Sequence, residues 1–156
     1  MQPTKENTLY LTIKQKYFDA ILAGTKKEEY REIKPTTYKK YLDVDEEGIP
    51  YFDDEKIDPN DPLAADICAY NNGVFPLYPK ENLHFLRLAV GYAKERDEMT
   101  VEVENITFEP MQDKAGKVLR FHDDGEQWLA DDNGELCLWI AVFHLGKVVE
   151  TKLKNK

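Results

Sequence analysis

Cysteine is scarce in this sequence, and its two copies, Cys68 and Cys137, stand far apart. Both lie in short apolar runs, where a reduced thiol behaves as a small hydrophobic side chain. Two such residues supply neither the framework of a disulfide-stabilised domain nor the paired spacing of a zinc site. We therefore expect a reduced protein that is stabilised by its core.

Long apolar segments are missing too. The opening residues MQPTKENTLYLTI contain no run long enough for a signal peptide, and no stretch approaches the roughly 20 apolar residues that cross a bilayer. We expect a soluble, cytoplasmic protein that does not contact a membrane.

Motifs that mark common enzymes and metalloproteins are also absent. The chain has no GxxxxGK[ST] loop, no GxGxxG and no GxSxG. Its three histidines, His84, His122 and His144, are far apart and lack the spacing of metal ligands. We expect neither a metal nor a cofactor.

Positive charge is in short supply, with 21 Lys and Arg against 30 Asp and Glu and a formal net charge of -9. Unselective binding of duplex DNA needs basic side chains that displace counterions, so we do not expect it. The deficit is concentrated in residues 43–61, which hold nine acids and one Lys. Because this stretch is also rich in Pro, it is predicted to be an acidic surface insertion. Residues 1–42 carry nine basic and five acidic side chains, which leaves a local contact with nucleic acid open.

What the chain does have is enough apolar material for one core. Its 156 residues are 42% hydrophobic and 12% aromatic, a composition typical of a single folded domain. No repeat or linker divides it, so we predict one domain over residues 1–156.

Hydrophobic periodicity predicts the elements of that domain. Alternating apolar residues predict a strand over residues 8–13, and three- and four-residue spacing predicts a helix over 15–23 that ends at Gly24. A short helix is predicted over 36–42. Further strands are predicted over residues 25–33, 65–70, 83–90, 101–109 and 136–145. The last strand, LCLWIAVFHL, is the most apolar run and is expected to be innermost. The sum is an α+β fold with one curved mixed or antiparallel sheet.

The segment TKKEEYREI, residues 25–33, concentrates the candidate chemistry. As a helix it would place like charges four residues apart, so a strand is favoured. In a strand, Glu29 and Arg31 project from one face, and Lys26 in the preceding turn can join them. Charged residues form strands poorly, which indicates a role for these three. The alternative is a solvated lattice of ion pairs, each worth about 0–1 kcal/mol.

The pattern Gly24-x-Lys26-x-x-Glu29-x-Arg31, placed after a helix, resembles the signature of the ASCH (activating signal cointegrator homology) domain family. The resemblance is strongest over LTIKQKYFDAILAGTKKEEYREIKPTTYKKYL and extends to the closing WIAVFHLGKVVE. It implies a PUA-like fold, which is a small curved β-barrel of five to seven strands with two or three flanking helices. It also implies a cleft beside the signature strand.

The same resemblance implies RNA, or a modified nucleoside or nucleotide, as the ligand. Arg31 offers a planar donor fork to phosphate or a base edge, and Tyr30 and Tyr70 offer stacking faces. Lys26 offers a point charge, while Glu29 accepts from an exocyclic amine or holds Arg31. The expected binding residues are Gly24, Thr25, Lys26, Glu29, Tyr30, Arg31 and Tyr70.

Two other functions stay open. Some small bacterial members of the family hydrolyse N4-acetylcytidine with Lys, Thr and Glu, so that Lys26 and Glu29 would be the catalytic residues of such an amidohydrolase. Glu29 stands at the position of the Thr, however, and a carboxylate does not replace a hydroxyl nucleophile. Thr25 is the remaining hydroxyl nearby. The third function is a protein-interaction module that presents residues 43–61 to a basic partner. The sequence does not indicate the oligomeric state.

Overall fold

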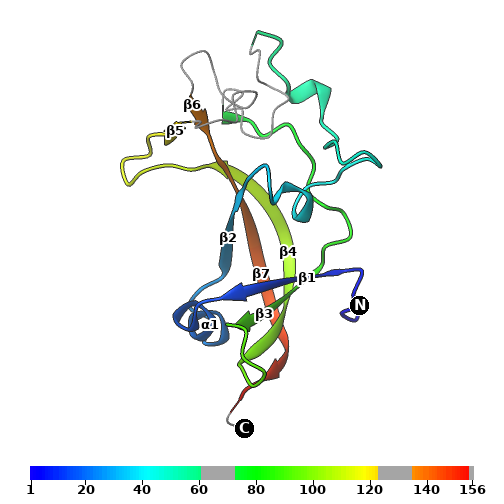
Figure 1. Cartoon of the computed structure of the whole chain (residues 1–156), viewed down its shortest axis with the longest axis vertical. Helices are drawn as coiled ribbons and strands as arrows, with labels where there is room; N and C mark the ends of the chain where they lie inside the picture. Colours follow the sequence, from blue (N-terminus) through cyan, green and yellow to red (C-terminus); the bar gives the residue numbers. More distant parts are fainter. Residues whose placement is uncertain (61–72, 123–134, 155–156) are drawn as a thin grey trace. The chain divides into compact units, whose positions relative to one another are not determined.

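The computed structural model describes residues 1–60, 73–122 and 135–154 (Figure 1). The predicted strand over 65–70 lies outside these residues. The described elements, in chain order, are β1 (Thr8–Ile13), α1 (Gln15–Leu22), β2 (Glu28–Ile33), the 3-10 helices η1 (Tyr38–Lys40) and η2 (Asp54–Lys56), β3 (Phe85–Val90), β4 (Glu98–Pro110), β5 (Arg120–His122), β6 (Glu135–Cys137) and β7 (Trp139–Lys152).

The protein is α+β, with a five-stranded mixed sheet as predicted. The strand order is β1-β3-β4-β7-β2, and β5 and β6 form a separate antiparallel pair. β1 runs parallel to β3, whereas β3 and β4 are antiparallel. β1 and β2 are the edge strands, so the described sheet does not close and the predicted barrel is not confirmed. In place of two or three flanking helices, the described chain has one α-helix and two 3-10 helices.

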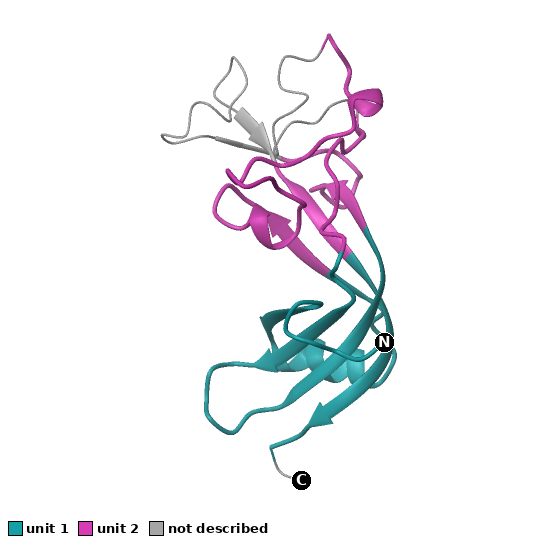
Figure 2. Cartoon of the chain, turned by 90° about the vertical axis from the view of Figure 1, so that its right-hand side faces the viewer, with its two compact units in different colours: residues 1–29, 82–106, 143–156 teal, residues 30–81, 107–142 magenta. Residues whose placement is uncertain are grey.

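The chain divides into two compact units (Figure 2). Unit 1 consists of Met1–Glu29, Asn82–Ile106 and Phe143–Lys156. Unit 2 consists of Tyr30–Glu81 and Thr107–Val142. The boundaries fall inside β2, β4 and β7, so these strands contribute residues to both units.

The core of unit 1 lies between α1 and the sheet. Leu11 of β1 and Leu88 of β3 are register partners, and both are buried. Phe18 and Ile21 are the buried residues of α1, and they give the helix its apolar face. Burial of such a side chain contributes about 1.5–3 kcal/mol, so this packing fixes the position of α1.

Helix α1 ends at Gly24, as the sequence predicts. Gly24 has a φ of 79°, its N–H donates to the Ile21 carbonyl at 3.0 Å, and the Thr25 N–H donates to the Ala20 carbonyl at 3.0 Å. These two bonds form a Schellman motif. The Lys26 N–H and the Thr25 hydroxyl also donate to the Ala20 carbonyl, each at 3.1 Å. The direction of the chain into β2 is therefore set by the helix end.

β7 is the inner strand that the most apolar run of the sequence predicts. It lies between β4 and β2, and four of its side chains are at most 1% exposed: Trp139, Ala141, Val142 and Phe143. The single strand predicted over 136–145 is wrong in its bounds, because the chain breaks at Leu138 into β6 and β7, and β7 continues to Lys152. Inside unit 2, Trp139 packs edge-on against Phe75, with ring centroids 5.0 Å apart.

The acidic segment that is predicted to be a surface insertion belongs to unit 2, and its residues 43–60 are described. Among residues 43–60, none is buried. The segment is nevertheless held by specific bonds: the Asp45 carboxylate accepts from the Ile49 N–H at 3.0 Å, and a β-bridge pairs Phe52 with Leu77. The short helix predicted over 36–42 is reduced to the single turn of η1.

No helix in the described part of the chain is both long enough and apolar enough to span a membrane.

Candidate ligand-binding site

The signature residues lie in both units. Lys26 and Glu29 belong to unit 1, whereas Tyr30 and Arg31 belong to unit 2. Along β2, Glu29 is 6% exposed, Tyr30 is 45% exposed and Arg31 is again partly buried. This alternation is that of a strand, and β2 occupies residues 28–33 of the strand predicted over 25–33. Tyr70 lies outside the described residues.

Lys26 is placed between a carboxylate and an aromatic ring, all within unit 1. Its Nζ lies 3.9 Å from Glu29 Oε1 and 5.3 Å from the centroid of the Tyr17 ring. Both the Lys26 and the Glu29 side chains are largely buried. The Lys26 ammonium group is thus held beside the loop that follows α1 by a carboxylate and an aromatic ring.

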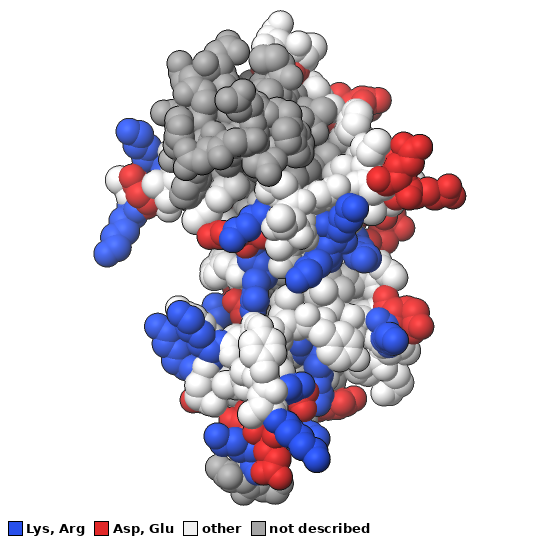
Figure 3. All heavy atoms as spheres, viewed as in Figure 1, with Lys and Arg blue, Asp and Glu red and all other residues white. Residues whose placement is uncertain are grey.

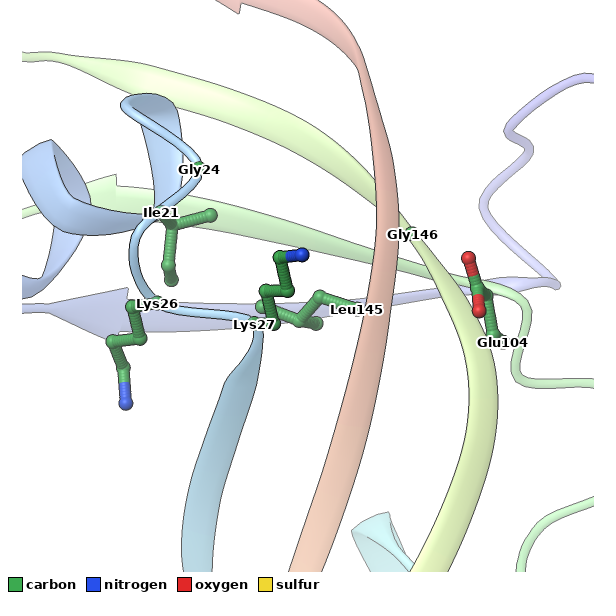
Figure 4. Close-up of a pocket in the computed structure, with 7 residues that line it drawn as sticks. All are labelled: Ile21, Gly24, Lys26, Lys27, Glu104, Leu145 and Gly146. Carbon is green, nitrogen blue, oxygen red and sulfur yellow. The ribbon is translucent and has the colours of Figure 1, made fainter.

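That loop lines a cavity of about 350 Å³, hereafter the loop cavity (Figure 4). Ile21 and Leu145 supply apolar walls, and Gly24 and Gly146 supply backbone. The charged lining consists of Lys26, Lys27 and Glu104. The volume falls within the range of small-molecule sites.

Two backbone features hold the loop cavity open. The Leu145 N–H donates to the Lys27 carbonyl at 2.9 Å and so joins the start of β2 to β7. A Cβ on Gly146 would lie 2.7 Å from Glu104 Oε1, so glycine at this position leaves the space that the Glu104 carboxylate occupies. In the view of Figure 4, the β7 ribbon at Gly146 runs between the side chains of Lys27 and Glu104.

The charges of the loop cavity suit a small polar ligand with both acceptor and donor groups. Ammonium groups such as those of Lys26 and Lys27 donate to phosphate or carbonyl oxygens, and a carboxylate such as that of Glu104 accepts from an amine. Of the residues predicted from the sequence, Gly24 and Lys26 line this cavity. Nothing in the sequence marked Glu104, which stands mid-strand in β4. Lys27 could have been noticed, because it is the neighbour of Lys26.

The Thr25 hydroxyl is engaged at the helix end. It donates to the Ala20 carbonyl at 3.1 Å, so its proton is directed toward α1. This contact gives Thr25 a structural role in ending the helix.

Arg31 acts on a buried phenol in unit 2. Burial raises the pKa of Tyr41, and the positive charge of Arg31 partly offsets this by lowering the same pKa. Tyr41 is 4% exposed. The sequence pattern did not predict a role for it, because it only stands next to the apolar residue Leu42. The guanidinium of Arg31 therefore lies close enough to Tyr41 for its field to be felt.

Charge on the described surface is mixed. On the face drawn in Figure 3, Lys and Arg atoms lie interspersed with Asp and Glu atoms. His144 Nδ1 lies 3.6 Å from Glu28 Oε2, and within the described ranges no three His, Cys, Asp or Glu side chains gather in a way that could hold a metal ion. A ligand that this protein recognises by charge is therefore expected to bind at a local cluster of charged side chains.

No protein-family model, curated protein or solved structure matches this chain. The resemblance to the ASCH family stays a prediction that depends on the signature residues.

Proposed function

We propose that this protein binds a nucleoside or nucleotide unit, either free or within RNA, at the loop between α1 and β2. The observation that carries the proposal is the loop cavity, a space of about 350 Å³ whose charged lining consists of Lys26, Lys27 and Glu104. In this assignment the ammonium groups face phosphate or ring carbonyl oxygens, and Glu104 accepts from an exocyclic amine.

We further propose that the chain is an ASCH-type domain with a PUA-like architecture. The order of strand, helix, helix-ending Gly24 and charged strand β2 supports this assignment. In a PUA-like domain the five-stranded mixed sheet would curl toward a small barrel, and the signature strand would border the ligand.

Binding is favoured over catalysis because of the position of the hydroxyl and carboxylate groups. Thr25 uses its hydroxyl to cap α1, and Glu29 takes the place at which the resembling hydrolases carry their Thr. Hydrolysis of N4-acetylcytidine is the second candidate, on the observation that Lys26 Nζ and Glu29 Oε1 are 3.9 Å apart in a partly buried setting. Such a pair can exchange a proton with a substrate amide.

Calorimetric titration of the full chain tests the proposal. The probes are cytidine, cytidine monophosphate, N4-acetylcytidine and a single-stranded hexanucleotide RNA. A charge-assisted hydrogen bond is worth about 1.5–3 kcal/mol, so Lys27→Ala should weaken binding about tenfold or more. Lys94→Ala, on an exposed residue outside the loop cavity, is the matched control and should bind as the wild type does.

Three results decide between the outcomes. Binding that is weakened by Lys27→Ala and by Glu104→Gln, with Lys94→Ala unchanged, supports the proposed site. Release of cytidine from N4-acetylcytidine that is lost in Lys26→Ala establishes the hydrolase instead. Absence of binding to every probe, or equal effects of Lys27→Ala and Lys94→Ala, contradicts the proposal.

A further inference from the structure

Unit 1 contains a second cavity, of about 330 Å³, which is lined by residues of β1, β3, β4 and β7 and by the N-terminal residues 3–5. We call it the strand cavity. Tyr10 is the register partner of Arg87, and Arg87 is the register partner of Thr100, so the three side chains form a row across the sheet. Their neighbours Leu11 and Leu88 point into the core. Since side chains alternate along a strand, the row lies on the face opposite that core.

Arg87 is the centre of the strand cavity, and its guanidinium is fixed by protein contacts. Nη1 donates to Thr100 Oγ1 at 2.8 Å, and Nε lies 3.7 Å from Glu98 Oε1. Thr100 is only 2% exposed, so the hydrogen bond that it accepts is well shielded from water. Glu98 is shared between two arginines, because Arg96 Nη2 also lies 3.7 Å from Glu98 Oε1. The planar donor fork is thus held in position by residues on the neighbouring strand.

The third partner of Arg87 is the replaceable one. Glu150 Oε2 lies 3.6 Å from Nη1, and the Glu150 side chain is 57% exposed. An ion pair with so exposed a carboxylate contributes little, because water and salt screen it. An incoming anion with better geometry can therefore take the place of Glu150 at the guanidinium.

The remaining lining offers a second cation, hydroxyl groups and an aromatic face. Lys5 and Thr8 line the cavity together with Tyr10. Tyr10 is 63% exposed although it is a large aromatic residue in the middle of a strand. An exposed aromatic ring offers a face on which a planar ring can stack, and the neighbouring arginine offers donors to a phosphate on that ring.

We propose that the strand cavity binds a phosphomonoester attached to a planar ring, of the nucleoside monophosphate type. The phosphate displaces Glu150 from Arg87 and takes donors from Arg87 and Lys5, while the ring stacks on Tyr10. A phosphate fits better than a carboxylate because its three terminal oxygens can accept both from the Arg87 fork and from the Lys5 ammonium group. The site is separate from the loop cavity and does not depend on the function proposed there.

Calorimetry with cytidine monophosphate, cytidine and inorganic phosphate tests this site in a Lys27→Ala background, which weakens the loop cavity. Cytidine monophosphate should bind more tightly than either fragment. Tyr10→Ser should weaken cytidine monophosphate about tenfold or more and leave inorganic phosphate unchanged, because only the stacking contact is lost. Tyr92→Ser, on an even more exposed tyrosine of unit 1 outside the cavity, is the matched control.

Glu150→Gln gives the sharpest readout, because its expected sign is opposite to that of ordinary loss of contact. Removal of the competing carboxylate should tighten cytidine monophosphate several-fold. Arg87→Lys keeps the charge but loses the fork and should weaken phosphate and nucleotide alike. Where Arg87→Lys lowers the melting temperature, the surface variants at Tyr10 and Glu150 still decide the question.

The proposal is overturned if cytidine monophosphate shows no saturable binding, if Glu150→Gln weakens it, or if Tyr10→Ser behaves as Tyr92→Ser does. A 5′-phosphorylated trinucleotide RNA distinguishes two sources of the same chemistry. Competition with cytidine monophosphate assigns the site to an RNA end, and absence of competition assigns it to a free mononucleotide.

Discussion

The loop cavity and the strand cavity of unit 1 have similar volumes and similar charged linings. Each contains two cationic side chains and one carboxylate: Lys26, Lys27 and Glu104 in the first, and Lys5, Arg87 and Glu150 in the second. They differ in how those groups are held. The loop cavity depends on backbone bonds at the end of α1 and on Gly146, whereas the strand cavity depends on side-chain bonds to Arg87.

This difference predicts which substitutions each cavity tolerates. A cavity formed by backbone geometry is sensitive to residues that alter φ or add a Cβ, even where those residues carry no charge. A cavity formed by side chains in register is sensitive to the chemistry of the strands themselves. The predictions below use substitutions that act on one cavity and not on the other.

The largest effect is expected from the core that supports α1. Phe18 is fully buried in that helix. Phe18→Ala should lower the free energy of unfolding by about 3–5 kcal/mol, because it removes apolar contacts and leaves a cavity. Urea unfolding followed by circular dichroism measures this. Tyr17→Ala, on an exposed neighbour in the same helix, is the control, and equal losses for the two variants would show that α1 is not anchored through Phe18.

A smaller decrease in the free energy of unfolding is expected from substitutions at Gly24, where α1 ends. Gly24→Val places a β-branched residue at a φ of 79° and should cost about 1–2 kcal/mol. Gly24→Asn should cost less, since Asn adopts the left-handed region more readily. Thermal unfolding gives the stabilities, and cytidine monophosphate titration should show the strand cavity unaffected. Equal stability of the Val and Asn variants would contradict the structural role of this φ.

A still smaller effect on stability is expected at Gly146. The Cβ of Gly146→Ala would lie 2.7 Å from Glu104 Oε1, and Glu104 is exposed and free to swing aside. Stability should therefore change by only about 0.5 kcal/mol, as for other surface substitutions. Ligand affinity at the loop cavity should fall as it does in Glu104→Gln. In a Glu104→Ala background, Gly146→Ala should have no further effect, and an additional loss there would show that the two residues act separately.

The smallest effect is expected at Asp97, which lines neither cavity. Hydrogen bonds from the Lys154 N–H and then from the Gln15 side chain lower the pKa of Asp97 below its ordinary value. A lowered pKa in the folded state means that this stabilisation is present above the ordinary Asp pKa and is lost as pH falls through the folded-state value. Carboxyl chemical shifts followed by NMR should show Gln15→Ala raising the pKa of Asp97, and an unchanged value would contradict the contact.

Local patterns were sufficient for the parts of the fold that are local. Alternation in residues 8–13, helical spacing in 15–23 and the glycine that follows predict β1, α1 and the end of the helix at Gly24, because each depends on neighbours within a few residues. Gly24 and Lys26, which the same local pattern singled out, line the loop cavity, and their role in binding stays a prediction. These calls needed no knowledge of which strands pair.

The parts that depend on pairing were not predictable in the same way. β7 continues to Lys152 through polar residues, which hydrophobicity alone does not extend. β4 begins at Glu98 because that residue pairs with Ala89 of β3. Closure of a barrel is likewise a property of the whole sheet, and the row of Tyr10, Arg87 and Thr100 exists only in the observed register.

The backbone carbonyl of Ala20 links the last turn of α1 to the loop that follows it. It accepts hydrogen bonds from the N–H groups of Thr25 and Lys26 and from the Thr25 hydroxyl. Those two amide protons can exchange with solvent only when the last turn of α1 opens, so their exchange should follow the opening of the helix end. We therefore expect the loop that leads into β2 to open together with the last turn of α1.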